Sequence, residues 1–353
     1  MNYNIGFYIH HHGSGHLMRA LAIAAHLHQT VIFLGSGLRD HQKCIPSEIQ
    51  CIHLPPDVPD QDDHDYAEGP EVDCLHYAPL NVNGIRRRNQ IIGNFFATTY
   101  PLLLIVDVSV EITLLARLFG VPTIVIRQHG IRNDTAHLAA YECASLLLAP
   151  YPEKLRTKSI EWVDKKTFFS GGFSRYTGLE RPFSYTSHDN YVAIITGKGG
   201  TSIDLAFISH LASVCPDFHF QIVGDIFAEN YSSANVVFHG ICAKPETILN
   251  LCRIVVGNAG HNTVMEVADL GKSFICIPEA RPFGEQLQKA LLIKQFYGIP
   301  LVMPDALFTT NWQDLLKEAS QSKPKWYDVI NEEALPQIAI AINQVAARSF
   351  GMA

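Results

Sequence analysis

The sequence predicts an α/β protein whose two doubly wound domains face each other across a cleft. Three observations lead to this prediction. Short apolar runs alternate with stretches in which apolar residues recur at helical spacing, a pattern typical of a parallel sheet covered by helices on both faces. The alternation stops between residues 151 and 189 and then resumes. A chain of 353 residues is also long enough for about two domains with separate cores.

Apolar runs of strand length in the first half of the chain indicate one parallel sheet. These runs are residues 5–9, 31–34, 49–54, 102–107, 123–126 and 146–149. The segments between them that have the helical period are residues 15–27, 85–99 and 111–119. We therefore expect an N-terminal domain over residues 1–180.

The second half repeats the pattern. Its strand-like runs are residues 191–195, 218–223, 236–238, 254–256, 274–277 and 301–303. Its helical segments are residues 201–214, 245–251, the stretch between Gly260 and Gly271, and residues 282–297 and 331–347. We expect residues 181–330 to form the second domain, and residues 331–353 to form a terminal helix that packs back towards the first.

The composition describes a folded protein with no general affinity for nucleic acid. Hydrophobic residues make up 47% of the chain and charged residues 17%, and the net charge is -7. The eight cysteines include no C-x-x-C pair, so neither a zinc site nor a redox motif is expected. The N-terminus lacks the basic region of a secretory signal, and no apolar run reaches the roughly 18 residues of a membrane span. We therefore expect a cytoplasmic protein.

Residues 253–290 hold the most informative stretch, a strand, glycine turn, helix and second strand. Such βαβ units bind ligands beyond the carboxyl ends of their strands. The first helical turn offers backbone N–H groups and a partial positive charge to a phosphate. The carboxylate of Glu266 suits the vicinal hydroxyls of a ribose. Together these features predict a nucleotide site, formed by Asn258, Gly260, His261, Asn262, Thr263 and Glu266.

Other loops at strand ends are expected to converge on the same cleft. The first contains Gly13, Ser14, Gly15 and His16. Because a helix N-terminus disfavours imidazolium, His16 is a candidate general base, although a helix-capping histidine is an equally ordinary interpretation. The second is Gly197-Lys198-Gly199-Gly200-Thr201, which is too short for an ATP-type P-loop but able to present N–H groups to a diphosphate. The third is the turn at His239-Gly240.

Two charged segments look like motifs but are interpreted as solvated surface. Asp60–Asp65 has aspartate where a calcium loop needs glycine, and its D-x-D pattern lies outside the cleft loops. Arg86-Arg87-Arg88 lies on a predicted helix. The alternative for the arginines is contact with an anionic lipid or acceptor phosphate, which would place the protein peripherally at the inner face of a membrane.

These residues resemble those of the two-domain GT-B glycosyltransferases, in particular family 28, which includes the bacterial N-acetylglucosaminyltransferase of the lipid-linked peptidoglycan precursor. The resemblance lies in G-x-x-T-x-x-E (Gly260, Thr263, Glu266) and in the later acid–glutamine pair Glu285-Gln286. It reappears at residues 13–22 and at Gly171-Gly172-Phe173, before the interdomain linker. The resemblance implies two Rossmann-like domains and a nucleotide-sugar donor, commonly a UDP-sugar, with dTDP not excluded.

The resemblance also implies roles for the site residues. Glu266 would bind the ribose, and the turn before Thr263 would bind the diphosphate. Glu285 and Gln286 would bind the donor sugar. The turn ending at Ile241 would lie at the nucleobase. The full donor-binding set is Gly13, Ser14, Gly15, Gly197, Lys198, Gly199, Gly200, Thr201, His239, Gly240, Ile241, Asn258, Gly260, His261, Asn262, Thr263, Glu266, Glu285 and Gln286. The family usually has aspartate at residue 285, which leaves the sugar preference open.

The implied reaction is an inverting transfer to an acceptor hydroxyl, without a metal or cofactor. His16 would be the base, and Asp107 is our first choice to orient it, with Glu111 and His129 as substitutes. Residues 13–19 also resemble nucleotide-sugar hydrolases of the same fold, in which water replaces the acceptor. A nucleotide-sugar 2-epimerase and a noncatalytic nucleotide-binding protein are further alternatives. The acceptor, whether a sugar, a lipid-linked molecule or a small molecule, is not specified by the sequence.

Overall fold

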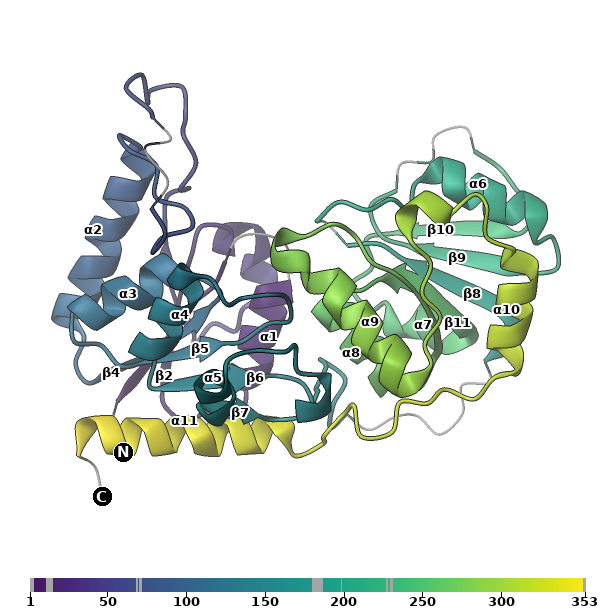
Figure 1. Ribbon diagram of the computed structural model, residues 1–353. Coiled ribbons are helices and arrows are strands. Elements are labelled where there is room, and N and C mark those ends of the chain that lie inside the picture. Colours follow the sequence, from purple (N-terminus) through teal and green to yellow (C-terminus); the bar gives the residue numbers. More distant parts are fainter. Residues whose placement is uncertain are drawn as a thin grey trace.

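The computed structural model describes residues 3–10, 15–67, 69, 72–179, 187–197, 199–226, 228 and 231–351. Within them, the chain forms two parallel sheets flanked by helices, in the orders β3-β2-β1-β4-β5-β6-β7 and β10-β9-β8-β11-β12 (Figure 1). We call the parts built on these sheets the N-terminal and C-terminal domains. The arrangement confirms the predicted fold class of two doubly wound domains.

The N-terminal sheet and its helices occupy residues 4–169. Its strands are β1 (Asn4–Tyr8), β2 (Thr30–Gly35), β3 (Gln50–His53), β4 (Leu102–Asp107), β5 (Thr123–Ile126), β6 (Leu146–Ala149) and β7 (Thr167–Phe169). Its helices are α1 (Gly15–Ala24), α2 (Asn83–Thr98), α3 (Val110–Leu118), α4 (Thr135–Cys143) and α5 (Glu161–Lys165), with 3₁₀ turns at η1 (Leu38–Cys44) and η2 (Glu153–Leu155).

The C-terminal sheet follows the interdomain segment. Its strands are β8 (His188–Ile195), β9 (His219–Val223), β10 (Val236–Gly240), β11 (Cys252–Asn258) and β12 (Ser273–Ile277). The helices are α6 (Leu205–Val214), α7 (Glu246–Leu251), α8 (His261–Asp269), α9 (Glu285–Tyr297), α10 (Trp312–Gln321) and α11 (Ala334–Phe350), with 3₁₀ turns at η3 (Pro282–Gly284) and η4 (Pro304–Ala306).

The central strands of both sheets are apolar because helices cover both faces. Every residue of β4 and of β12 is buried. In register, Gly6 of β1 lies opposite Ile32 of β2 and Leu104 of β4. The strand order reverses at β1/β4 in the first sheet and at β8/β11 in the second. Ligands bind such folds at these switch points, beyond the carboxyl ends of the strands.

The last helix returns to the N-terminal domain. Ile338 and Ile342 of α11 are buried in the same hydrophobic cluster as Ile5 of β1. Asn343 accepts a hydrogen bond from the Tyr3 hydroxyl at 2.9 Å. Figure 1 shows α11 running along the N-terminal domain after the chain has completed the C-terminal sheet. The terminal helix therefore ties the end of the chain to its beginning.

Some elements differ from those that the sequence predicts. The expected strand at residues 301–303 is reduced to a single parallel bridge between Cys276 and Leu301. The helix expected from residue 201 begins at Leu205, because Asp204 caps it by accepting from the Phe207 N–H. The unpredicted elements are β7, α4, α5 and α10. β7 and α5 are too short to show a periodic pattern of apolar residues. The start of α10 could have been predicted, because Asn311 is a typical helix cap and stands just before the buried residues of the helix.

The two charged segments are partly built into the fold. Arg88 is buried, pairs with Asp57 and donates to the Tyr8 hydroxyl at 2.6 Å. The solvated-face interpretation therefore fails for Arg88, because its helix turns it onto the sheet. In the acidic loop, Asp63 accepts from the backbone N–H groups of Asp60 and Asn83. Within the described part of the chain, no helix is both long and apolar enough to cross a membrane.

Candidate functional site

The turn after β11 presents the start of α8 to the cleft. Gly260 occupies the N-cap and has no side chain to cap the first turn. Among the described residues no side chain caps that turn, so its N–H groups can bind an anion, which the helix dipole also favours. Asn258, at the end of β11, instead donates to the Ile277 carbonyl at 3.1 Å and to Glu279 at 3.0 Å. Asn258 thus braces the two strand ends beneath the turn.

Glu266 lies one turn into α8 and is paired with Arg175. The carboxylate accepts from Arg175 Nε at 2.9 Å and from Nη2 at 3.0 Å. Burial raises the pKa of Glu266, and the guanidinium opposes that shift only in part. A carboxylate has further lone pairs, so a ribose diol can still be accepted beside the arginine. The sequence did not reveal Arg175, although it follows the recognised Gly171-Gly172-Phe173 segment by two residues.

The loop after β8 is held against this turn by Glu279. Its Oε1 accepts from the Ser202 N–H at 2.6 Å and from the Thr201 hydroxyl at 3.3 Å. Arg281 donates to the Gly200 carbonyl at 2.6 Å. The loop of Gly197, Gly199 and Gly200 therefore lies at the carboxyl end of the sheet near the α8 turn, while Lys198 lies outside the described residues. Asn258 is the last residue of β11, and Glu279 comes two residues after the end of β12, so the shared position at a strand end could have identified Glu279.

The residues of the predicted turn at His239-Gly240 are the last two residues of β10, the edge strand of the C-terminal sheet. His239 shares a hydrogen bond with Gln221 at 2.8 Å, and Gly240 has a left-handed backbone with φ +63°. Ile241 exposes 64% of its surface. An exposed isoleucine beside a tight turn offers an apolar face of the kind that a flat base can cover.

The predicted catalytic residues of the N-terminal domain, His16 and Asp107, lie close together beyond β1 and at the end of β4. His16 lies in the first turn of α1, and its Nδ1 is 3.1 Å from Asp107 Oδ2. Arg19, one turn further along α1, donates to both Asp107 oxygens, at 2.8 and 3.1 Å. Burial raises the pKa of Asp107, but Arg19 and His16 outweigh burial and hold that pKa well below its usual range. Gly13 and Ser14 lie outside the described residues.

His16 Nδ1 also lies 3.2 Å from Arg19 Nη2, which can only donate. Only the tautomer whose Nδ1 proton points to Asp107 leaves Nε2 a lone pair for a hydroxyl or water. The other candidates for orienting His16 are engaged elsewhere. Glu111 accepts from the backbone N–H groups of His76 and Tyr77. His129 is buried against Tyr151, with ring centroids 4.0 Å apart, and burial lowers its pKa well below the ordinary value.

The two halves of the site touch at two places. Asn262 of α8 donates to the Gly15 carbonyl at 3.2 Å, which brings the start of α8 against the start of α1. Gln128 lies just beyond β5. When its side-chain amide oxygen accepts from Arg19 at 3.1 Å, its amide nitrogen lies 3.3 Å from Glu285 Oε2. In this orientation the Gln128 side chain bridges the cleft. The structure therefore brings the predicted base and the predicted sugar-binding acid into one network.

Glu285 and Gln286 open α9. Glu285 pairs with the fully buried Lys289 at 3.2 Å, and Lys289 also donates to the Ala259 carbonyl. Burial raises the pKa of Glu285, but Lys289 and Arg132 outweigh burial and lower it, so the side chain is ionised. The Gln286 oxygen accepts from the Glu279 N–H at 3.0 Å. Lys289 had no signal of its own in the sequence beyond its spacing of four residues from Glu285.

Two small pockets flank these contacts. One lies between α1, the interdomain segment and α8, and its lining includes Arg19, Arg175, His261 and Glu266. Its volume is about 20 Å³, far below the several hundred Å³ of a typical ligand site. Around His261, burial lowers the imidazole pKa well below 6.5, and neighbouring cations add to this effect.

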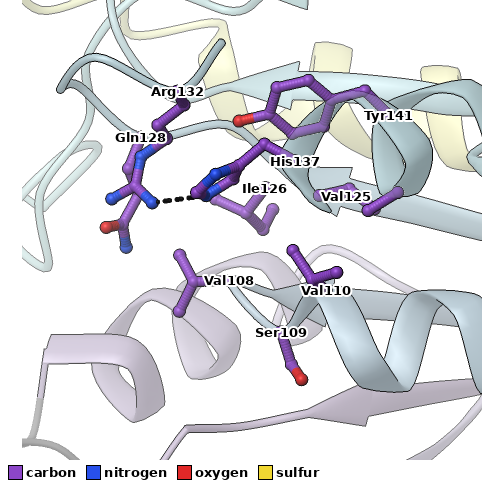
Figure 2. A pocket seen from close by; sticks show the side chains of 10 residues that line it. Val108, Ser109, Val110, Val125, Ile126, Gln128, Arg132, His137 and Tyr141 are labelled. Atoms are coloured by element: carbon purple, nitrogen blue, oxygen red, sulfur yellow. Dashed lines mark hydrogen bonds between the residues drawn. The ribbon is translucent and has the colours of Figure 1, made fainter. Parts of the chain in front are cut away.

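The second pocket lies within the N-terminal domain and is mostly apolar. Val108 and Val110 form one wall, and Gln128, Arg132 and His137 lie across from them (Figure 2). Arg132 Nη1 donates to His137 Nε2 at 2.8 Å. The volume of this pocket is about 10 Å³, about what one water molecule requires. Because Gln128 also contacts the Asp107 network, the pocket lies beside the base.

One set of side chains in the described residues has the composition of a metal site. Ligand atoms of His76, Asp134 and His137 lie within 4.8 Å of one another. Asp134 already accepts from both imidazoles, at 2.9 and 2.7 Å. Since Arg132 can only donate, His137 Nε2 must accept and the ring proton must lie on Nδ1. These hydrogen bonds already use the ligand atoms of the three side chains, and the adjacent Arg132 guanidinium would repel a cation.

Comparisons with known proteins agree with this geometry. Residues 223–334 match the glycosyltransferase family 28 C-terminal domain. A UDP-N-acetylglucosamine–N-acetylmuramyl-(pentapeptide) pyrophosphoryl-undecaprenol N-acetylglucosamine transferase of Streptococcus gordonii is 24% identical over 201 residues. That match covers 55% of this chain and 56% of the relative, so it spans only about half of each protein.

Solved structures extend the similarity of fold to the whole chain. An Arabidopsis thaliana protein complexed with UDP-L-rhamnose superposes with a TM-score of 0.66 at 14% identity, covering 99% of both chains. Acinetobacter baumannii MurG gives a TM-score of 0.58 at 14% identity, covering 98% of this chain and 100% of its own. At such identities the superpositions establish the fold. Residues 223–334 therefore resemble the glycosyltransferase family 28 C-terminal domain, and the chain as a whole has the fold of the two-domain GT-B glycosyltransferases.

Proposed function

We propose that this protein is a glycosyltransferase that moves a sugar from a nucleotide diphosphate sugar, a UDP-sugar, to an acceptor hydroxyl with inversion and without a metal ion. One observation carries the proposal. The His16–Asp107 pair and the uncapped start of α8 face each other across the interdomain cleft, joined by the Asn262–Gly15 hydrogen bond. A base and an anion-binding helix end are the two groups that such a transfer needs.

The proposed reaction follows from these positions. His16 Nε2 removes the acceptor hydroxyl proton as the oxygen attacks the anomeric carbon. The bond from that carbon to the diphosphate oxygen breaks, and the nucleoside diphosphate leaves with the electron pair. The N–H groups and dipole of α8 stabilise the charge that develops on the leaving group. Glu266 holds the ribose, and Glu285 and Gln286 hold the sugar.

The comparisons support the donor class. The S. gordonii relative is named for a UDP-sugar, and the A. thaliana structure contains UDP-L-rhamnose. The C-terminal family match includes Glu266, Glu285 and Gln286. We accordingly assign residues 181–330 to the donor and residues 1–180 to the acceptor, and we expect a cytoplasmic protein with no nucleic-acid partner.

A nucleotide-sugar hydrolase on the same fold is the second candidate. It is favoured by the resemblance of residues 13–19, a stretch whose Arg19 forms the two-pronged contact with Asp107. In that case water occupies the place of the acceptor, with the same base and the same leaving group. The two functions differ only in the molecule from which His16 removes a proton, an acceptor hydroxyl in the transferase and water in the hydrolase.

Incubation with UDP-, dTDP- and GDP-sugars, with and without candidate acceptors, tests the proposal. Release of nucleoside diphosphate is measured in the presence of EDTA, and NMR identifies the anomeric configuration of the product. Acceptor-dependent release with inversion supports the transferase. Rapid release without an acceptor identifies the hydrolase, and loss of turnover with EDTA refutes metal independence. Binding without turnover under any condition points to the noncatalytic alternative.

A further inference from the structure

Phe283 of the C-terminal domain packs against three side chains of the N-terminal domain, His76, Arg132 and His137, and we call this set of side chains the recess. Its ring centroid is 4.6 Å from that of His137, edge to face, and 5.2 Å from that of His76. The Arg132 guanidinium lies 4.7 Å over the ring. The Phe283 carbonyl also accepts from the Ile131 N–H at 2.8 Å, which makes a backbone hydrogen bond between the domains.

The recess is formed by side chains that hold one another in place. Asp134 accepts from His76 at 2.9 Å and from His137 at 2.7 Å, and Arg132 donates to the far nitrogen of His137. Arg132 also donates to the His129 carbonyl at 3.1 Å. The recess therefore does not depend on Phe283 for its shape. A pre-formed recess loses little conformational freedom when an aromatic ring enters it.

The backbone around Phe283 is arranged for this contact. Phe283 and Gly284 both have left-handed φ angles, 59° and 64°, which bulky side chains rarely adopt. Gly130 lies against the same loop, and a Cβ there would come within 2.8 Å of the Phe283 carbonyl oxygen. The strained residue is thus held by contacts on both its ring and its backbone.

The position of Phe283 matters because Glu285 follows it by two residues. Glu285 Oε2 lies 3.3 Å from the Gln128 nitrogen, and Gln128 connects to Arg19 and so to Asp107 and His16. A change in the position of Phe283 would therefore move Glu285 relative to the base. Glu266 makes none of these contacts, and the α8 turn is linked to Glu285 through Lys289, which donates to the Ala259 carbonyl at 3.2 Å.

We infer that Phe283 is a positioning residue, an interdomain hook that sets the closed spacing of the domains and aligns Glu285 and the donor sugar with His16. This inference rests on the proposed function, because alignment has a consequence only if a sugar is transferred or hydrolysed. It predicts that loss of the ring reduces the rate of the chemical step more than it reduces nucleotide binding.

The kinetic test compares Phe283→Leu, Phe283→Tyr and the control Phe296→Leu. Phe296 is an exposed aromatic of α9. Phe283→Leu should lower kcat for the nucleotide sugar about ten-fold or more, while the Kd for UDP alone stays within two-fold. Phe283→Tyr should recover most of the rate, because the ring remains, and Phe296→Leu should match the parent. An unchanged kcat in Phe283→Leu, or an equal loss of UDP affinity, would overturn the inference.

Hydrogen exchange supplies a readout that does not depend on activity. In Phe283→Leu the Ile131 amide should exchange about ten-fold faster than in the parent, whereas Phe296→Leu should leave it unchanged. Equal exchange in the parent and Phe283→Leu refutes the hook. If the parent turns over no nucleotide sugar, the proposed function fails and the positioning role fails with it, and the exchange result then decides whether the hook itself exists.

Discussion

At the scale of single residues, the site depends on groups whose charges are set by close partners. Asp107 is kept ionised by Arg19, and His16 lies within hydrogen-bonding distance of both. Arg19 competes with His16 for the carboxylate, so Asp107 has less capacity to stabilise an imidazolium than an aspartate that serves a histidine alone. The proposed base is therefore placed beside Asp107, with Arg19 in competition for the same carboxylate.

Replacement of His16 tests its role as the base. We expect His16→Ala to lower turnover about 10²–10⁴-fold, the usual contribution of a general base. The Kd for UDP should change less than two-fold, because UDP would bind the α8 side. Steady-state kinetics and calorimetry with UDP measure the two quantities. A mutant with parental turnover would remove His16 from the mechanism.

Replacement of Glu266 tests the ribose contact. Glu266→Ala removes the carboxylate that would accept two hydroxyl hydrogen bonds, and it leaves Arg175 near the nucleotide without its partner. We expect UDP to bind roughly 10–100-fold more weakly, since hydrogen bonds to a charged group contribute about 1.5–3 kcal/mol. Glu318→Ala, at an exposed position of α10, is the control. Equal affinities for UDP in parent and Glu266→Ala would argue against the contact.

At the scale of elements, residues at several helix ends make contacts in addition to those that cap the helix. Asp134 caps α4 by accepting from the His137 N–H and at the same time orients both imidazoles of the recess. Gly260 leaves α8 uncapped towards the cleft, and the left-handed Gly284 starts α9. The helix ends near the cleft thus hold either the interdomain contact or the expected ligand.

The buried imidazole of α4 predicts a loss of stability in acid. Burial and then Arg132 lower the pKa of His137 from 6.5 to about 4, although Asp134 opposes the shift. The unfolded chain therefore takes up a proton near pH 6.5 and the folded protein only near 4, so stability falls as the pH drops between these values. The loss should reach roughly 3 kcal/mol, at about 1.4 kcal/mol per pKa unit.

Denaturant unfolding of the parent and of His137→Gln measures this effect. The free energy of unfolding of the parent should approach that of the variant as the pH is lowered from 7 to 4, because glutamine does not titrate. Asp134 has a lowered pKa as well, but its contribution is lost only below about pH 4, outside this window. If the difference in free energy of unfolding between the two proteins stays constant from pH 7 to 4, folding does not change the pKa of His137.

At the scale of the whole molecule, the domains are joined at the hook of Phe283, the Asn262–Gly15 contact and the Gln128 bridge. They are also joined by the chain itself, since α11 crosses back to the first sheet. The pocket between α1 and α8 has a volume of about 20 Å³, so we expect the domains to open before a nucleotide binds and to close again afterwards.

The returning helix should be part of the N-terminal fold. Ile338→Ala, at a fully buried position of α11, should lower the free energy of unfolding by about 2–5 kcal/mol. Ile340→Ala, on the same helix but 56% exposed, should change it by less than about 0.5 kcal/mol. Hydrogen exchange should show faster opening in β1 than in β11 for Ile338→Ala. A stability equal to that of Ile340→Ala would mean that α11 is only loosely attached.

The sequence by itself determined the architecture and the locations of the binding loops. Periodicity separates strands from helices, and parallel strands place their carboxyl ends at one edge, so the loops after β1, β4, β8 and β11 could be assigned to the cleft. Short elements such as β7 could not be predicted, since three residues carry no period.

Only the tertiary structure decided which side chains meet. The proximity of Asp107 to His16 spans 91 positions of sequence, and no local pattern distinguishes Asp107 from Glu111 or His129 as its partner. Arg175, Gln128, Lys289 and Phe283 act through contacts between segments that are distant in the chain. Local sequence encodes backbone conformation and burial, whereas the pairing of charges across a cleft depends on how two separately folded sheets are placed against each other.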